Sequence, residues 1–222
     1  MIITAHDLNL LYQIEVHCEK CIRACVYADA VGGTRSNMWT FTQNCFAEAS
    51  ILHWCRVFGS RNEPTHYSRF FDGKCFPVPD GSLLTLDGLR VRLYRAAKMS
   101  EENYLRFWNN LKKGRDKYFV HDEFTATNRG QFPDLDVLKS TSLEMRDVIH
   151  DVVSNEESED PEMHKLFRER VQWHRNQEYL RDLENDAHSL KRVTMDGKEP
   201  EPSHGEATSD SAPSAESEAS HA

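Results

Sequence analysis

The chain has 222 residues, 39% of them hydrophobic, which is enough for one ordinary domain or two small ones with a sizeable core. Its net charge of −9 is uneven, because the segment from Thr194 onward holds seven acidic residues against Lys198 and carries −6 of the total. The remaining −3 is close to neutral, so the acidity of the whole chain does not exclude a nucleic-acid partner.

The composition argues against three other classes of protein. No stretch approaches the roughly 18–20 uninterrupted apolar residues of a membrane span. Residues 1–4 lack the basic start of a secretory signal peptide. Six cysteines are too few for a disulfide scaffold in a chain of this size. We therefore expect a cytoplasmic protein with no membrane contact.

Two helices are predicted in the first 59 residues. Thr4 and Asp7 have the spacing of a capping box, with Asp7 in place of the usual Glu or Gln. The stripe behind them recurs at steps of three and four up to Gly32, as on one face of a helix: Leu11, Ile14, Cys18, Cys21, Cys25 and Ala28. Residues 38–58 are apolar nearly all round, which predicts a helix surrounded by other helices and ended by Gly59.

The cysteines of these helices have two interpretations. Cys18 and Cys21 have the spacing of a zinc or redox pair, and His17 lies beside them. A structural zinc site usually needs a second ligand pair at defined spacing, and none is evident. Because the cysteines share a stripe with apolar residues, we favour small core side chains and expect no metal and no cofactor. The same interpretation covers Cys25, Cys45 and Cys55.

The middle of the chain is less regular. Residues 59–82 contain three prolines and three glycines, which predicts an irregular excursion with a short helix at 66–71. Residues 89–93 alternate like a strand but run into a helical pattern, so we predict a helix over 89–98. Ser100 is a good N-cap for the next helix, which is expected to reach about His121.

The last third of the chain is predicted to be helical up to about Lys191. A helix follows Pro133, and a long charged helix begins after the cap formed by Asp160 and Pro161. The apolar stripe of this long helix consists of only Leu166, Trp173 and Leu180, so we expect the helix to pack by a narrow edge or onto a partner. Its histidines, His164 and His174, are expected to be solvated. Residues 193–222 are predicted to be a disordered acidic Ser/Glu/Pro tail. The fold class is all-α.

The helix that begins at Ser100 carries the most specific signal. At about 100° per residue, Tyr104, Trp108 and Leu111 form a buried stripe, and Arg115 falls near its middle. Burying a guanidinium among apolar side chains costs free energy unless an acidic side chain or a bound anion pairs with it. Glu48, in an otherwise apolar helix, is a candidate partner; alternatively, Arg115 binds an anion.

Positive charge gathers on the same helix. Between residues 104 and 121 five cations stand against Asp116 alone, which is a footprint that attracts phosphates: Arg106, Lys112, Lys113, Arg115 and Lys117. For Lys112 and Lys113 the alternative is a solvated face that keeps the helix soluble. For Arg115 it is a structural ion pair, and for His121 a polar residue at the helix end.

The run from Arg115 to His121 resembles the signature of the HEPN superfamily (higher eukaryote and prokaryote nucleotide-binding). That signature is an Arg, then Asn, Asp or His, then a few variable residues ending in His, and Asp116 fills the second position. Residues 52–59 and Asp122 are similar to abortive-infection-associated HEPN-like proteins of bacteria. The resemblance extends over residues 5–190 as a helical pattern, and it implies a HEPN-like helical domain over residues 1–192.

The resemblance also implies a function. Catalytic members of the family are metal-independent ribonucleases that work at a dimer interface and act as toxins or anti-phage effectors. His121 would then be the general acid–base, Arg115 would hold the scissile phosphate, and Asp116 would orient one of them, giving 2′,3′-cyclic phosphate ends. Lys112, Lys113 and Lys117 would bind RNA. The implied partners are RNA, a second copy of the chain, and an antitoxin or a nucleotidyltransferase. The alternative is a non-catalytic dimerisation module.

Overall fold

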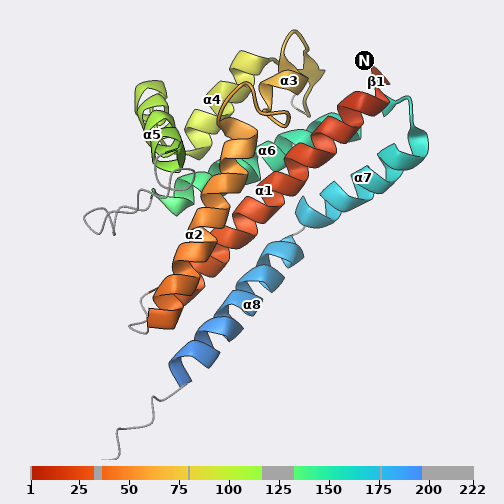
Figure 1. Ribbon diagram of the computed structural model, residues 1–222. Helices are drawn as coiled ribbons and strands as arrows, with labels where there is room; N and C mark the ends of the chain where they lie inside the picture. Colours follow the sequence, from red (N-terminus) through yellow and green to blue (C-terminus); the bar gives the residue numbers. More distant parts are fainter. Residues whose placement is uncertain (1, 33–36, 80, 117–132, 176, 197–222) are drawn as a thin grey trace, which may run out of the picture.

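The computed structural model describes residues 2–32, 37–79, 81–116, 133–175 and 177–196. Within these ranges the chain is all-α, as predicted, with a few two-residue strands (Figure 1). The helices are α1 (Ala5–Val31), α2 (Asn37–Phe58), α3 (Ser68–Phe71), α4 (Leu86–Ala96), α5 (Glu101–Gly114), α6 (Leu135–Asn155), α7 (Pro161–Arg175) and α8 (Gln177–Asp196).

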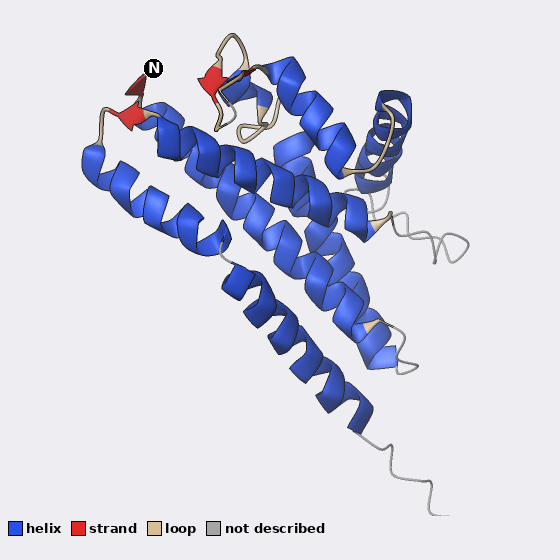
Figure 2. Cartoon of the chain, turned by 180° about the vertical axis from the view of Figure 1, so that it is seen from behind, coloured by secondary structure: helices blue, strands red, loops and turns tan. Residues whose placement is uncertain are grey.

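The short strands tie distant segments together. Strand β1 (Ile2–Ile3) pairs in parallel with β4 (Glu157–Ser158), which fixes the start of α1 beside the connection between α6 and α7. Strand β2 (Phe76–Pro77) pairs antiparallel with β3 (Leu83–Leu84) within the irregular excursion. Figure 2 shows both pairs at the same end of the molecule.

Helix α1 is the central element of the bundle. The Thr4 hydroxyl accepts a hydrogen bond from the Asp7 backbone N–H at 3.1 Å, which confirms the predicted cap. All six residues of the predicted stripe are buried. The helix packs against α2, α6 and α8, and α2 runs antiparallel beside it (Figure 1).

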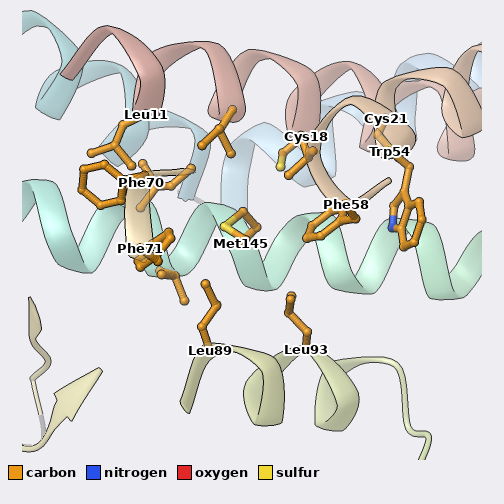
Figure 3. Close-up of a cluster of buried hydrophobic side chains, with 14 of the residues drawn as sticks. Leu11, Cys18, Cys21, Trp54, Phe58, Phe70, Phe71, Leu89, Leu93 and Met145 are labelled. Atoms are coloured by element: carbon orange, nitrogen blue, oxygen red, sulfur yellow. The ribbon is translucent and has the colours of Figure 1, made fainter. Parts of the chain in front are cut away.

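The main core lies where α1, α2, α4 and α6 meet the short helix α3 (Figure 3). Trp54 of α2 is fully buried, and its indole N–H donates to the Thr141 hydroxyl of α6 at 2.9 Å. Burial of such aromatic side chains supplies much of the stabilisation of a core. The cysteine stripe of α1 and Cys55 belong to this core, which confirms their predicted role.

The expectation that α2 is surrounded by other helices is wrong for its first half. Met38 and Phe41 are 65% and 69% exposed, and Cys45, predicted as a core residue, is exposed as well. The buried residues of α2 begin at Ala47 and become dense from Ile51 to the helix end. Composition alone did not separate these halves, because both are apolar and only the second lies against α6.

The single long C-terminal helix is also a wrong prediction, because two helices, α7 and α8, occupy this region (Figure 2). The predicted buried stripe is wrong as well, because Leu166 and Trp173 are 61% and 56% exposed. The buried residues are instead His164, Phe167, Val171 and His174 of α7, and Tyr179, Leu183 and Ala187 of α8. At about 100° per residue these two stripes differ by roughly 140° around a common axis, so one straight helix could not bury both.

The two histidines of α7 are buried rather than solvated. The ring of His164 lies 2.9 Å from the Val153 carbonyl, and His174 contacts the buried carboxylate of Glu15. Arg170 completes this cluster with an ion pair to Glu15 at 2.9 Å. The histidines therefore join α7 to α6 and α1, which the charged neighbours of α7 in sequence did not indicate.

Other predictions concern smaller segments. The short helix, the helix at 89–98 and the Ser100 cap are present as α3, α4 and the start of α5. The predicted tail at 193–222 lies outside the described residues except for the last turn of α8, which continues to Asp196. No helix in the described ranges is both long enough and apolar enough to cross a membrane.

Candidate functional site

The candidate site lies where the C-terminal end of α5 meets the C-terminal end of α2. Tyr104 and Leu111 are buried and Trp108 is partly buried, which confirms the predicted stripe. The Trp108 indole N–H donates to the backbone carbonyl of Phe58, the last residue of α2. Helix α5 ends at Gly114, and Arg115 keeps a right-handed helical backbone. The stripe therefore directs the Arg115 side chain toward α2 and the loop that follows it.

Arg115 is held by two carboxylates of its own chain. Its side chain is only 17% exposed. Its Nε donates to Oδ1 of Asp116 at 2.8 Å, and its Nη1 lies 3.6 Å from Oε1 of Glu63, which belongs to the loop after α2. Among the described residues these are the acids that pair with Arg115, so the predicted pairing with Glu48 is wrong. Glu63 was missed because it comes from an irregular segment without periodicity.

The electrostatics of the site follow from this pairing. Burial lowers the pKa of Arg115, but the contacts with Asp116 and Glu63 more than offset it, so the pKa lies above its ordinary value. The buried Cys55 thiol is close to the same charges. Burial raises its pKa to about 11, with Arg115 opposing and Asp116 adding to the shift. Arg115 is thus fully charged and Cys55 is an unreactive thiol at neutral pH.

Glu63 extends the site from α5 to α2. Its Oε2 accepts from Nη1 of Arg56 at 2.8 Å while its other oxygen faces Arg115. The Arg56 side chain is 57% exposed, so much of its guanidinium faces solvent. On the α5 side, Nζ of Lys112 lies 4.2 Å from the centre of the Trp108 ring, and Lys113 is exposed. Arg56, Arg115, Lys112 and Lys113 therefore form a row of cations. The carboxylates of Glu63 and Asp116 neutralise only part of its charge.

A pair of histidines lies at the other end of this row. His17 of α1 and His53 of α2 are both partly buried, with their Nδ1 atoms 3.0 Å apart. Burial, His53, Lys20 and Arg56 lower the pKa of His17 to about 4, and burial and Lys20 also lower the pKa of His53. The pair is therefore neutral near pH 7, because burial and the neighbouring cations both disfavour the charged form of each ring.

Sequence reasoning missed this pair. His17 was noted as a neighbour of the cysteine stripe, and His53 as part of an apolar segment and of the family resemblance at residues 52–59. The signal that brings them together is the register of α1 against α2, which cannot be read from either helix alone.

The structure places some of the predicted site residues and not others. It brings Arg115 and Asp116 together and puts Lys112 on the same helix end. Lys117 and His121 lie outside the described residues. In the described part of the chain no group of three or more His, Cys, Asp or Glu side chains is arranged to hold a metal ion.

Comparison with protein-family models, with curated proteins and with solved structures finds no match to this chain.

Proposed function

We propose that the chain is a metal-independent RNA endonuclease of the HEPN type, acting in the cytoplasm as a toxin or anti-phage effector. The observation that supports it most is the placement of Arg115. Its guanidinium is largely buried at a helix end, yet it adjoins the partly exposed Arg56 and the lysines of α5. A polyanion that follows this row would meet one charge after another.

The pairing of Arg115 suggests how it would act on RNA. Its contact with Glu63 is long at 3.6 Å, whereas its contact with Asp116 is a hydrogen bond. A phosphate oxygen would replace Glu63 while Asp116 kept the guanidinium in orientation. Arginine suits this exchange because its planar fork binds carboxylate and phosphate with the same geometry.

The remaining roles follow the sequence motif. His121 would contact the ribose 2′-hydroxyl or the leaving oxygen, and Lys112, Lys113 and Lys117 would bind neighbouring phosphates. Two copies would form the working unit, and an antitoxin or a nucleotidyltransferase would restrain it. Cleavage would leave 2′,3′-cyclic phosphate ends without a metal.

The test is cleavage of a mixed RNA pool by the purified full chain in EDTA. We expect Arg115→Ala and His121→Ala each to slow cleavage at least about 100-fold while leaving a folded protein. Arg168→Ala is the matched control, because Arg168 is an exposed arginine of α7 outside this group of cations. Equal cleavage by wild type and by the Arg115/His121 double variant would contradict the proposal.

A second candidate is a non-catalytic helical interaction module. The specific observation in its favour is that Glu63 and Asp116 already answer the charge of Arg115 within the chain. This candidate predicts no cleavage of any RNA, and a loss of about 1–3 kcal/mol of stability for Arg115→Ala because two acids lose their partner. Thermal melting followed by circular dichroism, beside the cleavage assay, separates the two candidates.

A further inference from the structure

The contact between His17 and His53 constrains where their protons lie. A hydrogen bond between two Nδ1 atoms 3.0 Å apart requires a proton on one of them and a lone pair on the other. The two rings are tilted by 33° with centres 5.3 Å apart, so they meet at their Nδ1 edges rather than stack. Two charged imidazolium rings could not share this bond.

This hydrogen bond also determines whether Nε2 of each ring carries a proton. In a neutral pair, the histidine that donates through Nδ1 has a lone pair at Nε2, and the histidine that accepts carries a proton at Nε2. The Nε2 atoms have no hydrogen-bond partner among the described residues. One ring therefore presents a base and its neighbour an acid. Burial and the cations nearby keep both rings neutral near pH 7.

Cations flank the pair. Lys20 follows His17 by three residues on α1, and Arg56 follows His53 by three residues on α2, so each cation lies on the same face of its helix as the histidine. Because α1 and α2 are antiparallel (Figure 1), the two cations extend from the pair in opposite directions along the helices. Both are exposed, and Arg56 leads through Glu63 to Arg115.

We propose that His17 and His53 form an acid–base relay that cleaves a phosphodiester next to a free hydroxyl, with Lys20 and Arg56 holding the phosphate. The proposal rests on the RNA endonuclease function above and assigns both of its proton transfers to this pair.

The step balances within the pair. The ribose 2′-oxygen attacks phosphorus, and its proton goes to the bare Nε2 of the first histidine. The Nδ1 proton of that ring crosses to Nδ1 of the second, whose Nε2 proton goes to the departing 5′-oxygen. The O2′–P bond forms and the P–O5′ bond breaks, giving a 2′,3′-cyclic phosphate and a 5′-hydroxyl. The pair stays neutral with its tautomers exchanged, and proton exchange with water restores them.

Asparagine gives a sharp test, because its amide reproduces the Nδ1 side of the imidazole and lacks an equivalent of Nε2. In single-turnover cleavage of RNA in EDTA, we expect His17→Asn and His53→Asn each to lose at least about 100-fold in rate. Their melting temperatures should stay close to that of the wild type. His6→Asn, an exposed histidine on the first turn of α1, is the matched control and should cleave normally.

A substrate with an activated leaving group separates a relay from a structural role. Uridine 3′-(p-nitrophenyl phosphate) releases p-nitrophenolate without needing a proton. Of His17→Asn and His53→Asn, the variant that has lost the general acid should therefore regain most of its cleavage rate on this substrate. The variant that has lost the general base should not. Equal impairment of both variants on this substrate would overturn the relay.

The remaining outcomes distinguish the relay from the function on which it rests. Normal RNA cleavage by both Asn variants, with loss in Arg115→Ala, overturns the relay and leaves the endonuclease in place. Dependence of cleavage on a divalent metal also overturns the relay, since a metal would occupy the Nδ1 lone pairs. Absence of cleavage by the wild type overturns both.

Discussion

Glu15 shows how much a single side chain contributes to joining α7 to the core. It has no exposed surface, and it lies between Arg170 at 2.9 Å and His174. Burial raises the pKa of its carboxyl, but His174 and Arg170 more than reverse that effect, so the pKa lies below its ordinary value. The carboxylate is therefore charged at neutral pH and paired on two sides.

Removing this charge should be costly. Glu15→Gln leaves Arg170 and His174 without their acid, and we expect a loss of about 3–5 kcal/mol in the free energy of unfolding, measured by urea denaturation at pH 7. The effect should disappear as the pH falls through the lowered pKa of Glu15, because the wild-type carboxylate is then neutral too. Glu102→Gln, which alters a solvent-exposed pair with Arg106, should be neutral. Equal stability of the two variants at pH 7 would contradict this role.

The histidine pair makes a separate prediction at acidic pH. The pKa of His17 is about 4 in the folded chain, against an ordinary 6.5. Above pH 6.5 the ring is neutral in both states, so it does not affect stability there. As the pH falls from 6.5 toward 4, His17 becomes protonated in the unfolded chain but stays neutral in the folded chain. The free energy of unfolding therefore decreases over this range.

His17→Asn removes this titration. Its urea midpoint should therefore fall less between pH 7.5 and pH 5.0 than that of the wild type. A parallel fall in both proteins would show that His17 does not titrate as its surroundings indicate.

At the scale of elements, the two halves of α2 should respond differently to mutation. Trp54→Ala removes a fully buried indole and its bond to Thr141, and should cost about 3–5 kcal/mol. Phe41→Ala trims a 69% exposed ring and should change stability by no more than about 0.5 kcal/mol. Chemical denaturation of both variants measures this contrast, and comparable losses would mean that the first half of α2 is covered in solution.

Helix α8 should open independently of the main core. Its buried residues Tyr179 and Leu183 pack on Ile22 in a cluster separate from the main one. At the junction with α7, the Arg146 guanidinium donates to the His174 carbonyl and lies over the Tyr179 ring, with its centre 5.2 Å away. Few buried apolar contacts are the usual mark of a unit that opens locally.

Leu183→Ala therefore should speed amide hydrogen exchange in α8 while leaving the protection of α1, α2 and α6 unchanged. Mass spectrometry of peptides from the exchanged protein reads this directly. Faster exchange throughout the bundle would show instead that α8 unfolds together with the core.

At the scale of the whole molecule, the sequence predicted what depends on neighbours along the chain. The Thr4 and Ser100 caps, the buried stripe of α1 and the partly buried position of Arg115 all follow from spacing within one helix. These features need no knowledge of where other elements lie.

The features that failed depend on contacts between distant segments. Packing against α1 and α6 determines which residues of α7 and α8 are buried. The spacing of Leu166 and Trp173 along the sequence therefore did not indicate that the helix is divided into two. Glu63 reaches Arg115 from an irregular loop. His17 and His53 are 36 residues apart, and only the packing of α1 on α2 joins them.

We propose that the face shared by α1, α2 and α5 cleaves RNA without a metal. Its most direct test is mass spectrometry of the ends produced when the purified full chain is incubated with RNA in EDTA. We expect fragments with 2′,3′-cyclic phosphate and 5′-hydroxyl ends from the wild type and none from the Arg115→Ala variant. Intact RNA, or the same fragments from the Arg115→Ala variant, would contradict it.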